Sequence, residues 1–370
     1  MAQQHLDPPT NPTAGPAPKL SASLEQGVTP TGDALAGYLR AQATEFLRSL
    51  RQHRETGAAV GGPEDSGDAA LALRRSARRI SGTLHTFRPL LDTDWSEGMR
   101  PELAWLSGTL AREHAYAARL ERLLLALHRL SGSSAFPPQS GGSAEVAGTG
   151  PATRPAAPER GNLTVGAAKA GALLERQLTL ARTRAHSAAL QALGSSRFHA
   201  VADSVAVLAS EVPLAPAAPA ADLHPLARAA EERLYDAVAT LPLVTAGHPY
   251  NAEALIHGLS PDPAPHPQDA PWHQVRLLLR LHRYAQEVLC GRYGENAPVD
   301  VRLLAAGQAL NRHRDASEAA AAAAAAARTP RIAPATAYAL GVLHADQRHE
   351  VEAARFAFEQ SWQRQAVGTP

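Results

Sequence analysis

The pattern of apolar and polar positions is helical along most of the chain. In residues 32–55, Leu35, Leu39, Phe46 and Leu50 recur at a spacing close to the 3.6 residues of an α-helical turn. Similar apolar stripes recur in later segments. Sustained alternation and runs of β-branched residues, which indicate strands, are weak throughout. The sequence therefore predicts an all-α protein of nine or ten helices.

Gly, Pro and Ser residues mark where these helices begin and end. Pro89 is expected to end or kink the helix before it, Ser195 to cap a helix, and Pro334 to occupy a first helical turn. The nine alanines of residues 319–327 favour a helix that another helix can approach closely, with a spacer or an aggregation-prone tract as the alternative. The segments predicted to be helical are residues 32–55, 71–91, 100–130, 162–193, 195–214, 223–241, 272–294, 299–327 and 334–363.

Composition divides the chain into one helical domain with flexible segments. Residues 1–30, rich in Pro, Thr, Gln and Ala, predict a disordered tail, and residues 366–370 a short C-terminal tail. Gly, Ser and Pro dominate residues 131–160, which predicts a flexible linker. The helical domain over residues 31–365 would then consist of a first half, 31–130, the linker, and the remaining helices of 161–365.

Charge and cysteine content exclude several classes of protein. The 36 Lys+Arg and 35 Asp+Glu give a net charge of +1, which argues against a generally basic nucleic-acid coat protein. Any anionic partner must therefore meet a local basic patch. Cys290 is the single cysteine, so neither a disulfide framework nor a Cys-rich zinc site is expected, which fits a cytoplasmic location. We find no apolar run long enough to span a membrane.

Positive charge is nevertheless concentrated in residues 71–91, which hold five Arg and no Asp or Glu. The positions that would share one helical face there are Arg74, Arg78, Ser81, His85 and Arg88. A second such face, in the predicted helix 272–294, consists of His273, Arg276, Arg280 and Arg283. The two segments align with each other, since Arg74 falls on Arg276 and Arg78 on Arg280. The chain thus contains a weak internal repeat, with an arginine stripe in each half.

The stripes need a physical reason because like charges one turn apart destabilise a helix by a few tenths of a kcal/mol per pair. A bound anion would supply it, since the planar arginine fork binds phosphate oxygens in pairs and stays charged. The alternative is a solvated face, or pairing with acids on a neighbouring helix, for which Glu113 and Glu231 are candidates. From the pattern, both explanations remain open.

Three motifs, in order, resemble the CHAD family, the conserved histidine α-helical domain. They are "RRISGTLHTFRPLL", "ELAWLSGTL" and "HQVRLLLRLHRY", and the resemblance extends over about residues 31–365. It implies an all-α fold of two similar helical bundles, about four to five helices each, related by a pseudo-two-fold around a basic central cleft. It also implies that the cleft binds inorganic polyphosphate.

The resemblance also singles out residues and departures from the family pattern. The residues that it and the stripes together assign to polyphosphate binding are Arg74, Arg78, Arg79, His273, Arg276, Arg280, Arg283, Tyr284 and Arg314. In the second half the family's Arg-Asp pair stands as Arg314 and Asp315. The first half has Leu71 where the family has His, Ser81 at a basic position, and Ala115 in place of Asp. The first half therefore looks eroded.

Catalytic and metal-binding patterns are missing from the sequence. It lacks the nucleotide-binding, zinc-protease and serine-hydrolase motifs, and the adjacent Glu231 and Glu232 would point to different helix faces. We therefore expect a non-catalytic cytoplasmic protein that binds polyphosphate without metal or cofactor and that could associate with polyphosphate granules. The alternative is a degenerate helical scaffold for protein–protein interaction that has lost polyanion binding; a polyphosphate-converting enzyme is the minority hypothesis. Nucleic acid is disfavoured by the 5% aromatic content.

Overall fold

The computed structural model describes residues 31–58, 63–132, 158–248, 266–291 and 300–363. Within these ranges there are ten α-helices and no strand; the β pairing found there is an isolated bridge between Leu91 and Leu214. The prediction of an all-α protein is confirmed. The predicted tails, 1–30 and 366–370, and residues 133–157 of the predicted linker lie outside the described residues.

Most helices follow the predicted segments closely. The α-helices are α1 (Gly32–Ala58), α2 (Pro63–Thr86), α3 (Thr93–Leu130), α4 (Pro158–Leu193), α5 (Ser196–Ser210), α6 (His224–Ala239), α7 (Leu243–Ala246), α9 (Ala270–Leu289), α10 (Val301–Ala327) and α11 (Pro334–Gln363). Short 3-10 turns precede α3, α6 and α9; they are η1 (Arg88–Leu90), η2 (Ala218–Ala220) and η3 (Pro267–Asp269). None of these helices, in the part of the chain that the structure describes, is long and apolar enough to cross a membrane.

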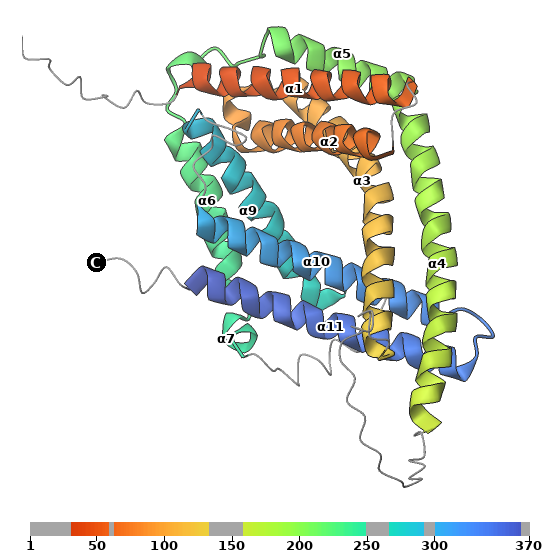
Figure 1. Cartoon of the computed structure of the whole chain (residues 1–370). Helices are drawn as coiled ribbons and strands as arrows, with labels where there is room; N and C mark the ends of the chain where they lie inside the picture. Colours follow the sequence, from red (N-terminus) through yellow and green to blue (C-terminus); the bar gives the residue numbers. More distant parts are fainter. Residues whose placement is uncertain (1–30, 59–62, 133–157, 249–265, 292–299, 364–370) are drawn as a thin grey trace, which may run out of the picture.

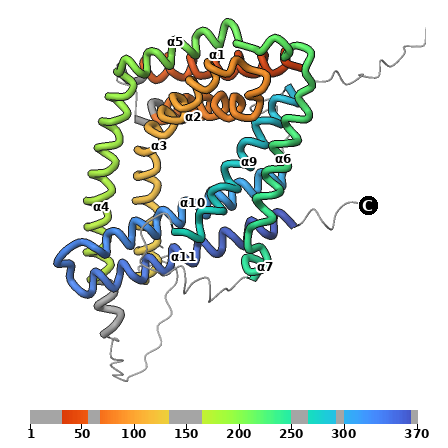
Figure 2. Tube along the Cα trace, turned by 180° about the vertical axis from the view of Figure 1, so that it is seen from behind, coloured from red at the N-terminus to blue at the C-terminus, as the bar shows by residue number. Residues whose placement is uncertain are grey.

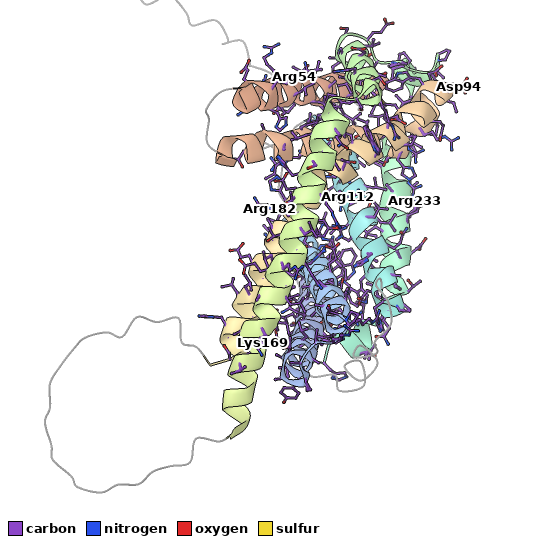
Figure 3. All side chains as sticks on the ribbon, turned by 90° about the vertical axis from the view of Figure 1, so that its right-hand side faces the viewer. Arg54, Asp94, Arg112, Lys169, Arg182 and Arg233 are labelled. Atoms are coloured by element: carbon purple, nitrogen blue, oxygen red, sulfur yellow. The ribbon has the colours of Figure 1, made fainter. Side chains whose placement is uncertain are left out.

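The helices are arranged as a four-sided frame (Figures 1 and 2). α1, α2 and α5 lie together on one side, and α10 and α11 run along the opposite side. α3 and α4 connect these two sides on one flank, and α6 and α9 connect them on the other. In the view from the α4 flank (Figure 3), α4 extends from the α1–α2 side past α10 and α11.

Three separate apolar cores hold this frame together. The first lies among α1, α2, α5, the start of α3, the start of α6 and the end of α9. The second lies among α3, α4, α10 and α11, and the third among α6, α9, α10 and α11. Because α5 packs on α1, the cores do not divide at the predicted linker. The predicted pseudo-two-fold between two bundles stays a prediction.

Long helices pass from one core to another, and their middle segments are polar. α3 buries Leu110 in the first core and Leu123 in the second, and α10 buries Leu310 in the third core and Ala319 in the second. Between those positions both helices carry several charged side chains, among them Arg119 and Arg122 on α3 and Arg314 and Glu318 on α10, although Ala316 of α10 is also buried. The fold therefore leaves a belt of charged side chains where the apolar cores end.

Several predicted helix ends are confirmed. The Ser195 hydroxyl accepts a hydrogen bond from the Phe198 N–H, and Pro334 is the first residue of α11. The alanine tract lies against α11, with Ala319, Ala323 and Ala326 buried. These small side chains let the two helices approach closely.

The helix that carries the first arginine stripe differs from its prediction at both ends. α2 begins at Pro63, eight residues before the predicted start at residue 71, and it ends at Thr86. Arg88 therefore lies in η1 rather than on the α2 face, and its Nε is 2.8 Å from Glu97 Oε1. The cause is Pro89, which cannot donate the hydrogen bond that a continuing helix needs.

Gly82 allows α2 and α9 to approach closely. A Cβ atom at this position would lie 2.7 Å from Cδ2 of Tyr284 and 3.1 Å from Cδ2 of Leu281, both on α9. Tyr284 is buried, so its ring has little room to move. The absence of a side chain at Gly82 thus sets how near the two arginine stripes lie.

We expect Gly82→Ala to destabilise the protein. The steric conflict with Tyr284 should cost about 1–3 kcal/mol, more than the roughly 1 kcal/mol that alanine gains over glycine in a helix. The matched control is Gly108→Ala on α3, where a Cβ meets nothing within 4 Å, and which should raise stability slightly. Urea unfolding of both variants provides the measurement. Equal stabilisation by both would contradict the close packing at Gly82.

Candidate functional site

Five arginines from three helices form one electrostatic group. We call this group the arginine cluster; its members are Arg74 and Arg78 on α2, Arg276 and Arg280 on α9, and Arg314 on α10. Burial, followed by the charges of neighbouring cluster arginines, lowers the pKa of Arg78 to about 10 and that of Arg276 to about 9. Burial also lowers the pKa of Arg74 and Arg280, again with cluster arginines contributing. Because arginine stays charged in proteins, the five side chains repel one another.

Few carboxylates compensate this charge. Among the described residues, Arg74, Arg78 and Arg280 form no ion pair, and Arg276 donates only to Asn311 Oδ1, at 3.3 Å. The Nε atoms of Arg74, Arg78 and Arg276 are buried and have no hydrogen-bond partner there. Buried donors of this kind are usually satisfied, so these three side chains are candidates for contact with a ligand.

Arg314 differs from the other cluster members because it has an acid beside it. Its Nε donates to Asp315 Oδ1 at 2.9 Å, and its Nη2 also contacts that oxygen. These are the two residues that stand at the positions of the family's Arg-Asp pair in the sequence. The charge of Arg314 also reaches the other two helices, since it helps to lower the pKa of Arg74 on α2 and of Arg280 on α9.

Arg79, although predicted as a ligand, is committed to an ion pair inside the protein. Its Nε donates to Glu287 Oε2 at 2.8 Å, and its Nη2 donates to Glu287 Oε1 at 3.2 Å. The hydroxyl of Tyr38 on α1 donates to the same Glu287 Oε2 at 2.8 Å. Burial, and then the charge of Glu287, raises the pKa of Tyr38. Arg79 therefore joins α1, α2 and α9 and does not face the cluster as a free cation.

Two other predicted residues flank the cluster. The buried ring of Tyr284 packs beneath Arg79, whose guanidinium carbon is 5.9 Å from the ring centroid. Arg283 is exposed, and its charge helps to lower the pKa of Arg280. Arg283 therefore lies next to the cluster at its solvent side, whereas Tyr284 contributes packing.

His273 lies near the beginning of α9, at the α10 side of the cluster. Its Nε2 is 3.5 Å from the Ser317 hydroxyl, and its ring meets the edge of His313 with 5.5 Å between centroids. Burial lowers the pKa of His273; Asp269 opposes the shift, whereas the Arg276 charge adds to it. The imidazole is therefore neutral at neutral pH in the free protein.

A buried network that the sequence did not reveal supports this end of α9. Asp269 Oδ2 accepts from Arg348 Nη1 at 2.7 Å, and Asp269 Oδ1 accepts from Arg355 Nη2 at 2.7 Å. His313 Nε2 lies 3.5 Å from Asp269 Oδ1. Burial lowers the pKa of His313 to about 4, so its imidazole is neutral. The only sequence signal was the spacing of the two arginines, which puts both on one face of α11.

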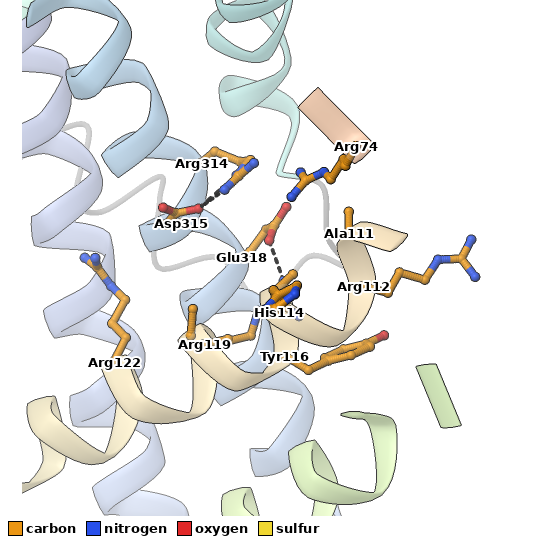
Figure 4. Close-up of a pocket in the computed structure, with 12 residues that line it drawn as sticks. Arg74, Ala111, Arg112, His114, Tyr116, Arg119, Arg122, Arg314, Asp315 and Glu318 are labelled. Atoms are coloured by element: carbon orange, nitrogen blue, oxygen red, sulfur yellow. Dashed lines mark hydrogen bonds and ion pairs between the residues drawn. The ribbon is translucent and has the colours of Figure 1, made fainter. Parts of the chain in front are cut away.

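A pocket of about 510 Å³ opens beside the cluster, between α2, α3 and α10 (Figure 4). Arg74 and Arg314 line it from the cluster side, and Arg119 and Arg122 line it from α3. Arg112 also belongs to its rim, but in Figure 4 its side chain points away from the other arginines. No sequence signal marked the α3 arginines: they follow no motif, and the positions that correspond to the family's Arg-Asp pair, His114 and Ala115, lie about one turn before Arg119.

The far end of the predicted α2 stripe does not belong to the cluster. His85 Nδ1 is 3.0 Å from Arg100 Nη2, and burial, followed by the charge of Arg100, lowers the pKa of His85. Arg100 in turn pairs with Glu97. Among the described residues, no group of His, Cys, Asp and Glu has the arrangement to hold a metal ion.

The all-helical fold that carries this arginine cluster is that of a known family of domains. The family model described as "CHAD domain" matches residues 41–324, and the chain belongs to this family. The chain is 71% identical in sequence to PptA from Streptomyces chartreusis, over 90% of this chain and 99% of that one, with a TM-score of 0.72.

A plant protein shares the fold. The CHAD domain from Ricinus communis aligns with 93% of this chain and 94% of its own, at 16% identity and a TM-score of 0.50. A comparison with curated proteins finds no match.

We expect Arg79→Met to destabilise the fold by roughly 3 kcal/mol, because it leaves the buried carboxylate of Glu287 without its partner. The double variant Arg79→Met/Glu287→Met should recover part of this loss, since it removes the unpaired carboxylate but also the acceptor of the Tyr38 hydroxyl. Thermal or urea unfolding of the two variants, compared by a double-mutant cycle, measures the coupling. A stable single variant would show that Arg79 does not hold α2 against α9.

Proposed function

We propose that this CHAD-family protein binds inorganic polyphosphate, without catalysis, along a basic cleft built from the arginine cluster. The observation that supports it best is the set of buried Nε donors of Arg74, Arg78 and Arg276, which have no partner among the described residues. Their helices bring the donors together from sequence positions some 200 residues apart. A polyanion would satisfy several of them at once.

The mechanism is electrostatic. A phosphate chain carries about one negative charge per unit, and each arginine fork offers paired hydrogen bonds to its oxygens. Binding also releases the counterions that the chain holds in solution. Because the cluster arginines repel one another, part of the gain comes from relief of that repulsion.

The proposal also includes a pseudo-two-fold relation between the halves, a preference for polyphosphate over nucleic acid, and a cytoplasmic location. The two stripes meet across α2 and α9, as equivalent faces of two bundles related by a pseudo-two-fold would. Repetitive phosphate requires neither base stacking nor a cofactor, so nucleic acid is a poorer fit. We expect the protein in the cytoplasm, in association with polyphosphate granules.

The experiment is a titration of labelled polyphosphate into wild-type protein and two double variants. Arg276→Ala/Arg280→Ala should weaken binding by at least about tenfold, since a charge-assisted contact contributes about 1.5–3 kcal/mol. Arg74→Ala/Arg78→Ala should weaken it less, because the first half lacks the His of the family pattern. Affinity should also fall steeply with added salt.

The matched control is Arg176→Ala/Arg184→Ala, which removes the same charge from two exposed positions of α4. It should change affinity little. Failure of folded wild-type protein to bind polyphosphate at low salt would favour the degenerate scaffold, to which the substitutions at Leu71 and Ala115 point. Equal binding by all three double variants would show that the cluster is not the site.

Polyphosphate affinity should rise as the pH falls below about 6.5, the ordinary value for a histidine. In the free protein burial lowers the pKa of His273, whereas a nearby phosphate would raise it. Binding then takes up a proton, and proton uptake makes affinity increase toward low pH. Titrations at pH 5.5 and pH 8 measure the effect, and His273→Gln should reduce it. If His273→Gln showed the same pH dependence as the wild type, the proton taken up on binding would belong to a group other than His273.

A further inference from the structure

Glu318 lies among the basic groups beside the cluster. Its carboxylate pairs with Arg119 Nη2 across the pocket, as the dashed line in Figure 4 shows. The same charge opposes the lowering of the pKa of Arg276 and of His273. One carboxylate of α10 thus compensates positive groups on both α3 and α9.

In the Arg119–Glu318 pair, the acid is more exposed than the arginine. The Glu318 side chain is 41% exposed, so it can turn toward solvent, whereas Arg119 is 17% exposed and remains in the wall. The guanidinium of Arg119 stays packed 5.4 Å from the ring centroid of Tyr116, which fixes its position without help from the acid. Its Nε is buried and has no partner among the described residues. The Nε–H group of Arg119 is therefore available to donate a hydrogen bond to a ligand.

We propose that Glu318 is an internal anion that a phosphate group replaces, and that Arg119 then becomes a ligand of the polyphosphate chain. This inference rests on the proposed function and extends the site from α2 and α9 into the pocket against α3. Arg74 and Arg314, which line the same pocket, connect the two parts. The first half of the chain would thus contribute a ligand outside the positions of the family pattern, where it has His114 and Ala115.

The proposal predicts affinity changes of opposite sign for the two partners. Glu318→Gln removes the competing charge and should tighten polyphosphate binding by about two- to fivefold, the range expected for a partly exposed ion pair. Arg119→Gln removes a ligand and should weaken binding by about fivefold or more. Both substitutions break the same pair, so a purely structural role would give both variants the same sign.

Two controls match these changes in charge. Glu121→Gln, at an exposed position of α3, corresponds to Glu318→Gln, and Arg176→Gln on α4 corresponds to Arg119→Gln. Each should alter affinity by less than about twofold, since exposed charges are screened by salt. Melting curves without ligand verify that all four variants fold. If Arg119→Gln does not, Arg119→Lys keeps the charge but loses the fork, and it should still weaken binding.

The outcomes separate this inference from the proposed function. Absence of polyphosphate binding by the wild type overturns both. Wild-type binding that Arg119→Gln leaves unchanged, or that Glu318→Gln weakens, overturns the inference alone. Melting curves add a further check: Glu318→Gln should lower the melting temperature of the free protein and enlarge the increase that polyphosphate produces, because ligand binding to the folded state adds stability.

Discussion

The structure depends on the buried ion pair between Arg79 and Glu287. It joins α2 to α9, the two helices whose arginine stripes repel each other, and the hydroxyl of Tyr38 brings α1 into the same contact. An acid inserted within either stripe would neutralise the cluster. Glu287 instead lies one turn beyond Arg283 on α9, where it pairs with Arg79 of α2 and leaves Arg74 and Arg78 without an ion pair. On α2, Arg79 forms the attractive ion pair, and the preceding residue, Arg78, repels the other arginines of the cluster.

The division of the interior into three cores explains where the charged belt lies. A helix that serves one core presents a continuous apolar stripe, but α3 and α10 change cores midway, so their stripes are interrupted. Charged side chains in the segments between two cores lose part of their hydration to the adjacent apolar residues but remain partly exposed to solvent. Arg78 on α2 and Arg276 on α9 lie close enough to Arg314 of α10 to sense its charge, and their own partial burial lowers their pKa while leaving both charged. A fully buried arginine would need a permanent partner, as Arg348 has in Asp269, and a fully exposed one would bind an anion weakly.

Local signals explain what the sequence could and could not predict. Apolar periodicity gave the helices, and the i, i+4 spacing of Arg74 and Arg78 placed them on one face, because both properties depend on a single helix. The same spacing could not show that Arg79, one residue further on, pairs with Glu287, because that contact joins positions far apart in the chain. Arg119 was missed for the same reason, as its role depends on α10 lying opposite α3. Arg88 was placed wrongly because Pro89 ends the helix just before it.

The cluster also implies a trade between stability and binding. Each uncompensated arginine that improves binding of a polyanion raises the free energy of the folded protein without ligand, since like charges are held close in partly desolvated surroundings. The chain limits this strain with two acids one turn apart on α10, Asp315 beside Arg314 and Glu318 opposite Arg119. A third acid would stabilise the free protein further but would compete with every phosphate that enters. The exposed position of Glu318 resolves the conflict, because a carboxylate that can move into solvent stabilises the empty site and yields to a ligand that carries more charge.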